Sequence, residues 1–114
     1  MYRVCKSFTF NAAHKLIAPY EGKCNRIHGH TWRVDVVVVS EILDPCGMVV
    51  DFNHLSLLGN YIEKRFDHAT VNDTVTQPTA ENIARHIYEW CRTHWSVERV
   101  RVWESDSAWA EYGS

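Results

Sequence analysis

The stretch TWRVDVVVVS, from Thr31 to Ser40, is the most strand-like part of this 114-residue chain. It begins by alternating apolar and polar residues and ends as a run of β-branched valines, a pattern typical of a well-buried strand. Residues 2–10 also alternate, with four large apolar residues in phase: Tyr2, Val4, Phe8 and Phe10. The two stretches predict two strands that each bury one face, and 31–40 is expected to be the more buried.

Further strands are predicted on the C-terminal side of this stretch. Asp44-Pro45-Cys46-Gly47 is a typical turn, so residues 48–50 are expected to return as a third strand antiparallel to 31–40. Residues 97–104 alternate again, with Val100 and Val102 on the apolar face. Residues 108–112 are expected to return beside them as a last strand.

Two helices are predicted between these strands. Asn53 is a plausible N-cap for the first, and its apolar residues recur at helical spacing: Leu55, Leu58, Ile62 and Phe66. Thr79 is a plausible N-cap for the second, which carries Glu81 in its first turn and a longer apolar face: Ile83, Ile87, Cys91 and Trp95. Strands and helices occupy separate parts of the chain, which predicts an α+β fold with a largely antiparallel sheet.

Length and composition indicate one domain over residues 1–114. Lys and Arg number 12 and Asp and Glu 14, and the net charge of -2 offers no general attraction to nucleic acid or to an anionic membrane. No apolar stretch has the length of a signal peptide or membrane anchor, so a cytoplasmic protein is expected. The four cysteines are irregularly spaced and are expected to be free thiols.

Three histidines form a candidate metal site. His28 and His30 flank Gly29 at the start of the predicted strand, and side chains two apart on a strand share a face. His14 ends the segment that follows the first strand and can reach the same point. Three imidazoles without a fourth protein ligand are typical of catalytic zinc, whose open position takes water or substrate. The same residues also fit ordinary polar positions, and spacing alone favours neither reading.

Cys24 lies four residues before His28, close to any metal that His28 binds. A nearby cation lowers the pKa of a thiol and supplies thiolate, so Cys24 is a candidate base or nucleophile. Two alternatives stay open for this residue. A fourth zinc ligand would close the site to substrate, and a small buried side chain would have no chemical role.

Two acidic positions complete the candidate set. Asp67 precedes His68 directly, and an aspartate can orient an imidazole that moves protons, although such pairs are common by chance. Glu104 is in phase with Val100 and Val102, so the apolar face ends in a carboxylate. A carboxylate there suits the paired N–H donors of a 2-amino-4-oxopyrimidine, and it equally suits a neighbouring arginine.

Six segments, taken together, resemble the 6-pyruvoyl-tetrahydropterin synthase family, in particular its 6-carboxy-tetrahydropterin synthase branch. They run through most of the chain in the family's order: FTFNAAHKL (8–16), CNRIHGHTW (24–32), GMVVDF (47–52), FDHATVND (66–73), PTAENIA (78–84) and VRVWES (100–105). The three residues between Cys24 and His28 resemble the carboxy-pterin branch, since the animal pyruvoyl enzymes have a longer spacer.

The resemblance implies roles for these residues. The zinc ligands of the family correspond to His14, His28 and His30. Its catalytic cysteine corresponds to Cys24, its charge-relay pair to Asp67 and His68, and its pterin-anchoring glutamate to Glu104. Thr79 and Glu81 are implied to face the pterin pocket as well, although positions at the start of a helix explain both without a ligand.

The resemblance also implies a fold, an assembly and a reaction. The fold is the tunnelling fold (T-fold), with a four-stranded antiparallel sheet, two helices on one face, and homo-oligomeric rings whose active sites lie between subunits. The implied reaction is zinc-dependent conversion of 7,8-dihydroneopterin triphosphate to 6-carboxy-5,6,7,8-tetrahydropterin, acetaldehyde and triphosphate, toward queuosine and other 7-deazaguanines. The alternatives are triphosphate elimination by a 6-pyruvoyl-tetrahydropterin synthase and a non-catalytic zinc-stabilised binding domain.

Overall fold

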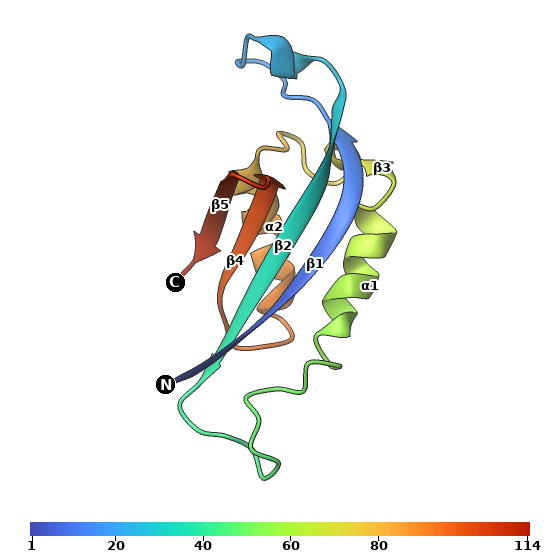
Figure 1. Cartoon of the computed structure of the whole chain (residues 1–114). Helices are drawn as coiled ribbons and strands as arrows, with labels where there is room; N and C mark the ends of the chain where they lie inside the picture. The colour runs from blue at the N-terminus through green and yellow to red at the C-terminus, as the bar shows by residue number, and fades with distance from the viewer.

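The computed structural model describes all of residues 1–114 and combines two α-helices with a five-stranded sheet (Figure 1). The chain contains, in order, β1 (Tyr2–His14), a 3-10 turn (Lys23–Asn25), β2 (His28–Ser40), α1 (Ser56–Arg65), β3 (Ala69–Thr70), a second 3-10 turn (Val71–Asp73), α2 (Ala80–Cys91), β4 (Val97–Ser105) and β5 (Ala108–Gly113). Neither helix is long and apolar enough to cross a membrane.

The sheet differs from the predicted four-stranded antiparallel one. Its strand order is β3-β1-β2-β4-β5, and β3 runs parallel to β1 while the other pairs are antiparallel. The expected sheet of four antiparallel strands was therefore wrong, whereas the largely antiparallel sheet predicted from the strand pattern is confirmed. β3 holds only two residues, Ala69 and Thr70, which is too short for any alternation to be visible in the sequence.

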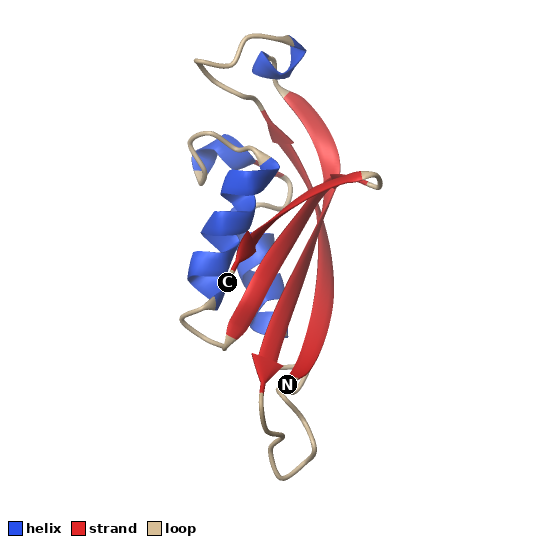
Figure 2. Cartoon of the chain, turned by 90° about the vertical axis from the view of Figure 1, so that its left-hand side faces the viewer, coloured by secondary structure: helices blue, strands red, loops and turns tan.

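Both helices cover one face of the sheet and leave the other face open (Figure 2). Alternate residues of β2 point toward the helices. Four of them in succession are buried: Trp32, Val34, Val36 and Val38. The helices contribute apolar residues at the predicted spacing, and these too are buried: Leu58, Ile62, Ile83, Ala84, Ile87 and Cys91. The alternation in the strands and the helical period in the helices thus meet in one core.

The segment after β2 does not form the predicted third strand. The turn at Asp44 is present, because the amide of Gly47 donates to the Asp44 carbonyl at 2.9 Å. The Asp44 carboxylate then accepts the amides of Cys46 and Met48, both at 2.9 Å, so the chain closes on itself locally. These local bonds compete with strand pairing, and the prediction of a strand over residues 48–50 was wrong.

The two helices begin differently. α2 begins as predicted, since the hydroxyl of Thr79 accepts the amide of Asn82 at 3.1 Å. α1 begins later than the predicted cap at Asn53, because residues 51–58 form successive i to i+3 turns before the helix becomes regular. Leu55 and Phe66 are nevertheless fully buried on either side of α1, as its apolar pattern predicted.

The open face of the sheet holds a buried carboxylate on β2. Asp35 is only 6% exposed, and its two oxygens accept hydrogen bonds from Ser7 at 2.6 Å, from Arg33 at 2.9 and 3.0 Å, and from the Trp103 indole at 2.9 Å. Burial alone would raise the pKa of this carboxyl, but the hydrogen bonds outweigh burial and hold its pKa below the usual value. Asp35 is therefore ionised in the folded protein.

We expect Asp35 to stabilise the fold in a pH-dependent way. A folded-state pKa below the unfolded value of about 3.9 means that the contribution is complete above that value and is lost as the pH falls through the folded pKa. The difference in unfolding free energy between the native protein and Asp35→Asn, measured in urea, should therefore shrink between pH 5 and the acid limit. Asp73→Asn, at an exposed aspartate without a side-chain hydrogen bond, is the control and should show no comparable trend. An undiminished difference at acid pH would contradict this explanation.

Candidate metal centre and substrate cavity

Three histidines meet where β1 ends and β2 begins, at one end of the elongated molecule (Figure 1). His14 and His28 are register partners, and His30 follows two residues later on the same face. The ring centroid of His14 lies 4.5 Å from that of His28 and 5.1 Å from that of His30. One ligand atom from each ring lies within 4.8 Å of the others, so the three histidines could hold one metal ion.

Hydrogen bonds fix the orientation of two of these rings. The Nδ1 atom of His14 lies 2.7 Å from the carbonyl of Pro78, and Nδ1 of His28 lies 2.7 Å from the carbonyl of Arg26. A carbonyl oxygen only accepts, so Nδ1 carries the proton in both rings and the lone pair of Nε2 is available for a metal. Such carbonyl partners commonly orient histidine ligands.

The remaining ring atoms fit a metal as well. Nε2 of His14 and of His30 are buried and have no hydrogen-bond partner. Burial is the main cause that lowers the pKa of both residues, and it outweighs the Pro78 carbonyl at His14 and Glu104 at His30. Both imidazoles are therefore neutral at pH 7, as a metal ligand must be. A bound cation would supply the partner that each of these buried nitrogens lacks.

Two side-chain amides hold the chain in place just after His14. Asn72 exchanges two hydrogen bonds with the backbone of Lys15, at 3.0 and 2.9 Å. Gln77 does the same with the backbone of Ile17, at 2.8 and 3.0 Å. Sequence reasoning missed both residues, because they lie in a polar stretch that reads only as a loop. They tie this loop to the end of β1, beside the Pro78 carbonyl that orients His14.

Cys24 lies on the loop beyond the histidines, in the 3-10 turn of residues 23–25. Its backbone carbonyl accepts the amide of Leu16 at 2.8 Å, and its side chain is partly buried. It is a free thiol and is not a member of the three-histidine cluster. The neighbouring Cys24 side chain raises the pKa of Tyr20. Tyr20 was not predicted from the sequence.

Asp67 and His68 lie beside β1 but away from the cluster. The Asp67 carboxylate accepts the amide of Asn11 at 3.0 Å and lies 3.1 Å from Nδ1 of His68. The Asn11 amide, followed by His68, holds the pKa of Asp67 below its usual value. Asn11 precedes His14 by three residues, which corresponds to about 10 Å along the strand. The two side chains therefore lie together, but they do not contact the cluster within the chain.

His68 has an uncommon backbone conformation. Its φ is +56°, in the left-handed region, and its amide donates to the Asn11 carbonyl at 2.7 Å. Its side chain is 79% exposed. Non-glycine residues in this region cluster at functional sites, where the surrounding structure enforces the conformation. The left-handed turn lets the chain leave α1 and present the imidazole outward.

Glu104 lies next to the cluster and lines a cavity. Its carboxylate is 3.5 Å from Nε2 of His30, and it shares a cavity of about 220 Å³ with Glu81 and Trp109. Glu81 faces this cavity from the first turn of α2, whereas the hydroxyl of Thr79 is taken up by its capping bond. The structure thus brings two of the predicted substrate-binding residues together, and it gives Thr79 a structural role. Trp109 was not predicted to contribute.

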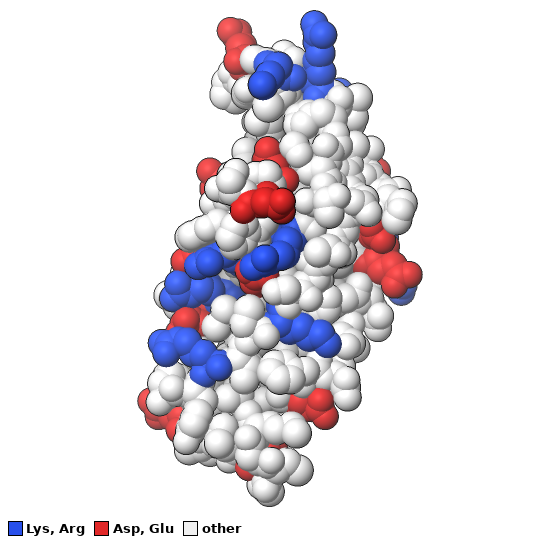
Figure 3. Space-filling model, viewed as in Figure 1, with Lys and Arg blue, Asp and Glu red and all other residues white.

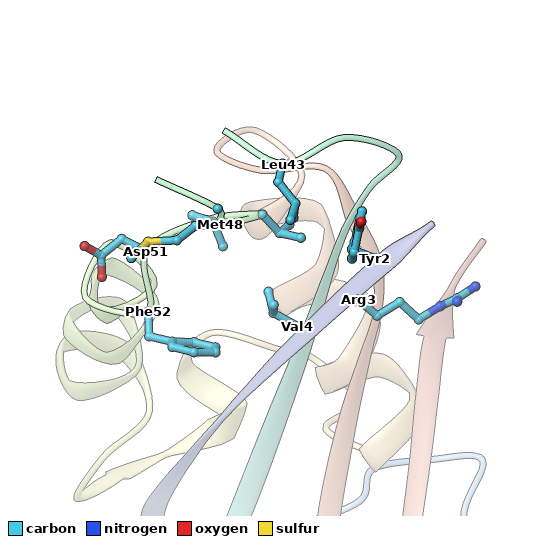
Figure 4. Close-up of a pocket in the computed structure, with 10 residues that line it drawn as sticks. Tyr2, Arg3, Val4, Leu43, Met48, Asp51 and Phe52 are labelled. Atoms are coloured by element: carbon cyan, nitrogen blue, oxygen red, sulfur yellow. The ribbon is translucent and has the colours of Figure 1, made fainter. Parts of the chain in front are cut away.

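A second, apolar cavity lies at the opposite end of the sheet and contains none of the predicted site residues. Its volume is about 280 Å³, and side chains from the start of β1 and from the loop after β2 surround it (Figure 4). Tyr2, Val4, Leu43, Met48 and Phe52 are among them. Its lining offers no cluster of groups that could hold a metal.

Comparison with known proteins shows the family of the chain. The family model described as 6-pyruvoyl tetrahydropterin synthase matches residues 3–114. The chain belongs to this family. Among solved structures, 6-pyruvoyl tetrahydropterin synthase from Caenorhabditis elegans superposes with a TM-score of 0.87 at 25% identity, covering 99% of this chain and 95% of the other. The T-fold of the family therefore accommodates a five-stranded sheet here.

Two relatives of this chain are named for a specific enzyme activity. A protein from Synechocystis named 6-carboxy-5,6,7,8-tetrahydropterin synthase is 40% identical over 95 residues, which cover 77% of this chain and 73% of the relative. A protein from Pyrococcus furiosus named dihydroneopterin monophosphate aldolase is 34% identical over 109 residues, covering 91% of this chain and 90% of the relative. Both names describe pterin chemistry.

Proposed function

We propose that this family member is a zinc-dependent carbon–carbon lyase. It converts 7,8-dihydroneopterin triphosphate to 6-carboxy-5,6,7,8-tetrahydropterin, acetaldehyde and triphosphate, on a route to 7-deazaguanines such as queuosine. The observation that carries the proposal is the cluster of His14, His28 and His30 with the Glu104 carboxylate 3.5 Å from His30. This cluster occurs in a chain whose relatives include a 6-carboxy-5,6,7,8-tetrahydropterin synthase.

The three histidines are proposed to bind Zn²⁺. Three neutral imidazoles suit zinc, and the absence of Cys24 from the cluster leaves a coordination position for substrate. When bound, zinc acts as a Lewis acid that acidifies neighbouring O–H and C–H bonds. The Pro78 and Arg26 carbonyls keep Nε2 of His14 and His28 directed at the ion.

Glu104 and Glu81 are proposed to bind the pterin ring in their shared cavity. A carboxylate accepts two parallel N–H bonds from a 2-amino-4-oxopyrimidine edge, in the way that it accepts a guanidinium. Because Glu104 is also close to His30, a ring held by this carboxylate would place its substituent near the metal position. Thr79 contributes by fixing the start of the helix that carries Glu81.

Cys24 is proposed to move protons on the substrate side chain. It lies on the loop beyond the histidines, and Tyr20 is its neighbour on that loop. The cations Lys15, Lys23 and Arg26 are exposed on the same end and are candidates for binding the triphosphate. Figure 3 shows Lys and Arg side chains at this tip of the molecule.

Asp67 and His68 are proposed to exchange protons from a different side. Asp67 orients the imidazole of His68, which points outward at the sheet edge. Because the pair does not contact the cluster within one chain, we propose that the active enzyme is a homo-oligomer in which subunits enclose the site together. The exposed edges of the sheet are suited to such assembly. We also propose that the single domain spans residues 1–114 and works in the cytoplasm.

Two other reactions compete with this proposal. A 6-pyruvoyl-tetrahydropterin synthase would eliminate triphosphate without breaking a carbon–carbon bond, and the likeness to the Caenorhabditis elegans enzyme supports it. An aldolase would break the same side-chain bond without reducing the ring, and the Pyrococcus furiosus relative supports it. The non-catalytic zinc-binding domain would need Cys24 as fourth ligand, and Cys24 is outside the cluster.

Identifying the products separates these reactions. The zinc-loaded protein is incubated with 7,8-dihydroneopterin triphosphate in water enriched in oxygen-18, and the products are analysed by mass. The substrate carbon that becomes the carboxylate carries one oxygen, so water must supply the other and label the 6-carboxy product. Acetaldehyde and a labelled carboxy-pterin are expected. A pyruvoyl-pterin without acetaldehyde, or a pterin alcohol with a phosphorylated aldehyde, would refute the proposal.

A further inference from the structure

Glu104 lies at a β-bulge in the hairpin of β4 and β5. Trp103 pairs with Trp109 and Ser105 pairs with Ala108, so two residue steps along β4 lie opposite one residue step along β5. The extra residue is Glu104. Bulges leave one residue outside the regular ladder and re-aim its side chain, so the direction of a bulged residue depends on how its neighbours are held.

The neighbour on the N-terminal side, Trp103, is held on the opposite face of the sheet. Its indole N–H donates to Oδ2 of Asp35 at 2.9 Å. The guanidinium of Arg33 lies over its ring at 4.6 Å, and the ring of Trp109 lies 6.0 Å away. The bond to a buried, ionised carboxylate is of the stronger, charge-assisted kind.

The Asp35 carboxylate is fixed in turn by residues of β1 and β2 on the same face. Ser7 on β1 and Arg33 on β2 donate to it, so the Trp103 indole is bonded to a group that cannot easily move. On the C-terminal side, Ser105 to Ser107 form an exposed turn. Its hydroxyl contacts are long, at 3.4 Å, and therefore weak. The firm support of the bulge therefore comes from the Asp35–Trp103 bond.

We propose that Asp35 and Trp103 are positioning residues for Glu104. The bond on the open face of the sheet sets the direction in which the bulge presents the Glu104 carboxylate to the cavity on the helix side. Neither residue touches the substrate. The inference deepens the proposed function, on which it rests for the role of Glu104 in holding the pterin ring.

The variant Trp103→Phe tests this inference, because it removes the N–H donor and keeps an aromatic ring. We expect KM for 7,8-dihydroneopterin triphosphate to rise about fivefold, because the lost bond acts on the pterin ring only through Glu104 and part of its free energy reaches binding. The kcat should stay within about twofold, since ring binding and not the chemical step is loosened. Zinc content should be unchanged. The dissociation constant for 7,8-dihydroneopterin, which has the ring without the phosphates, should rise in parallel with KM.

Trp95→Phe is the matched control. It removes the same kind of bond, from an indole N–H to Nδ1 of His54 at 2.7 Å, beyond the other end of β4. It reproduces any general loss of stability without touching the bulge, and KM is expected to stay at the native value.

Amide hydrogen exchange makes the test independent of turnover. Residues 104–108 should exchange faster in Trp103→Phe than in Trp95→Phe. Equal exchange in the two variants, or an unchanged KM and pterin affinity in Trp103→Phe, would overturn the inference. If the native protein fails to turn over the substrate, the proposed function fails. The exchange comparison and the affinity for 7,8-dihydroneopterin then still decide whether the bond positions Glu104.

Discussion

His28→Ala is expected to lose most of its bound metal and, with it, turnover. Nε2 of His28 is one of three nitrogens proposed to hold the ion. Zinc binding in four-ligand structural sites is worth about 10–16 kcal/mol, so each ligand carries roughly 2.5–4 kcal/mol and its loss weakens affinity roughly 10²- to 10³-fold. Metal analysis after dialysis against a weak chelator measures the loss directly, and activity should fall with it.

His28 is a better choice for this experiment than His14. His14 is 2% exposed and bonded to Pro78, so its removal would also leave a buried carbonyl without a partner. His28 is only partly buried, and its Arg26 carbonyl partner lies on an exposed loop. His94→Ala, at an exposed histidine after α2, is the matched control and should keep full metal and activity. Full metal occupancy in His28→Ala would contradict the three-histidine site.

Cys24→Ala should keep its metal and lose turnover. The thiol is outside the histidine cluster, and a general acid–base group contributes about 10²- to 10⁴-fold to a rate. A drop of that size in kcat with unchanged metal content and unchanged pterin affinity is the expected result. Steady-state kinetics and metal analysis on the same sample are the measurement.

The other outcomes of this experiment have definite meanings. Cys46→Ala is the control, because Cys46 is an exposed thiol in the turn after β2 and should be dispensable. Loss of metal in Cys24→Ala would make the thiol a ligand. Full activity in a metal-loaded Cys24→Ala would remove it from the chemistry altogether. Either result would refute the role proposed here.

Much of the fold follows from periodic patterns in the sequence. The alternation in 31–40 and the helical spacing of Ile83, Ile87 and Cys91 predict which side chains are buried, because both patterns depend on one-sided burial. Patterns fail where local bonds decide the structure. The Asp44 carboxylate closes a turn in place of a strand at 48–50, and the two residues of β3 are too few to alternate.

The meeting of the three histidines was predictable from the sequence, but the contacts around them were not. His14, His28 and His30 share a face for the simple reason that strand residues two apart do so, and the pairing of β1 with β2 joins the two ends. The carbonyls that orient the rings, the amides of Asn72 and Gln77, and the bulge at Glu104 are all contacts between distant segments. The spacing of residues along the chain does not reveal such long-range contacts.

Three histidines are proposed to hold one metal ion with one coordination position left open. X-ray absorption at the zinc edge of the loaded protein, free of substrate, measures the ligand set directly. Only nitrogen and oxygen neighbours near 2.0–2.1 Å are expected, with three imidazoles among them. A sulfur neighbour at about 2.3 Å would place Cys24 on the metal and contradict the open site.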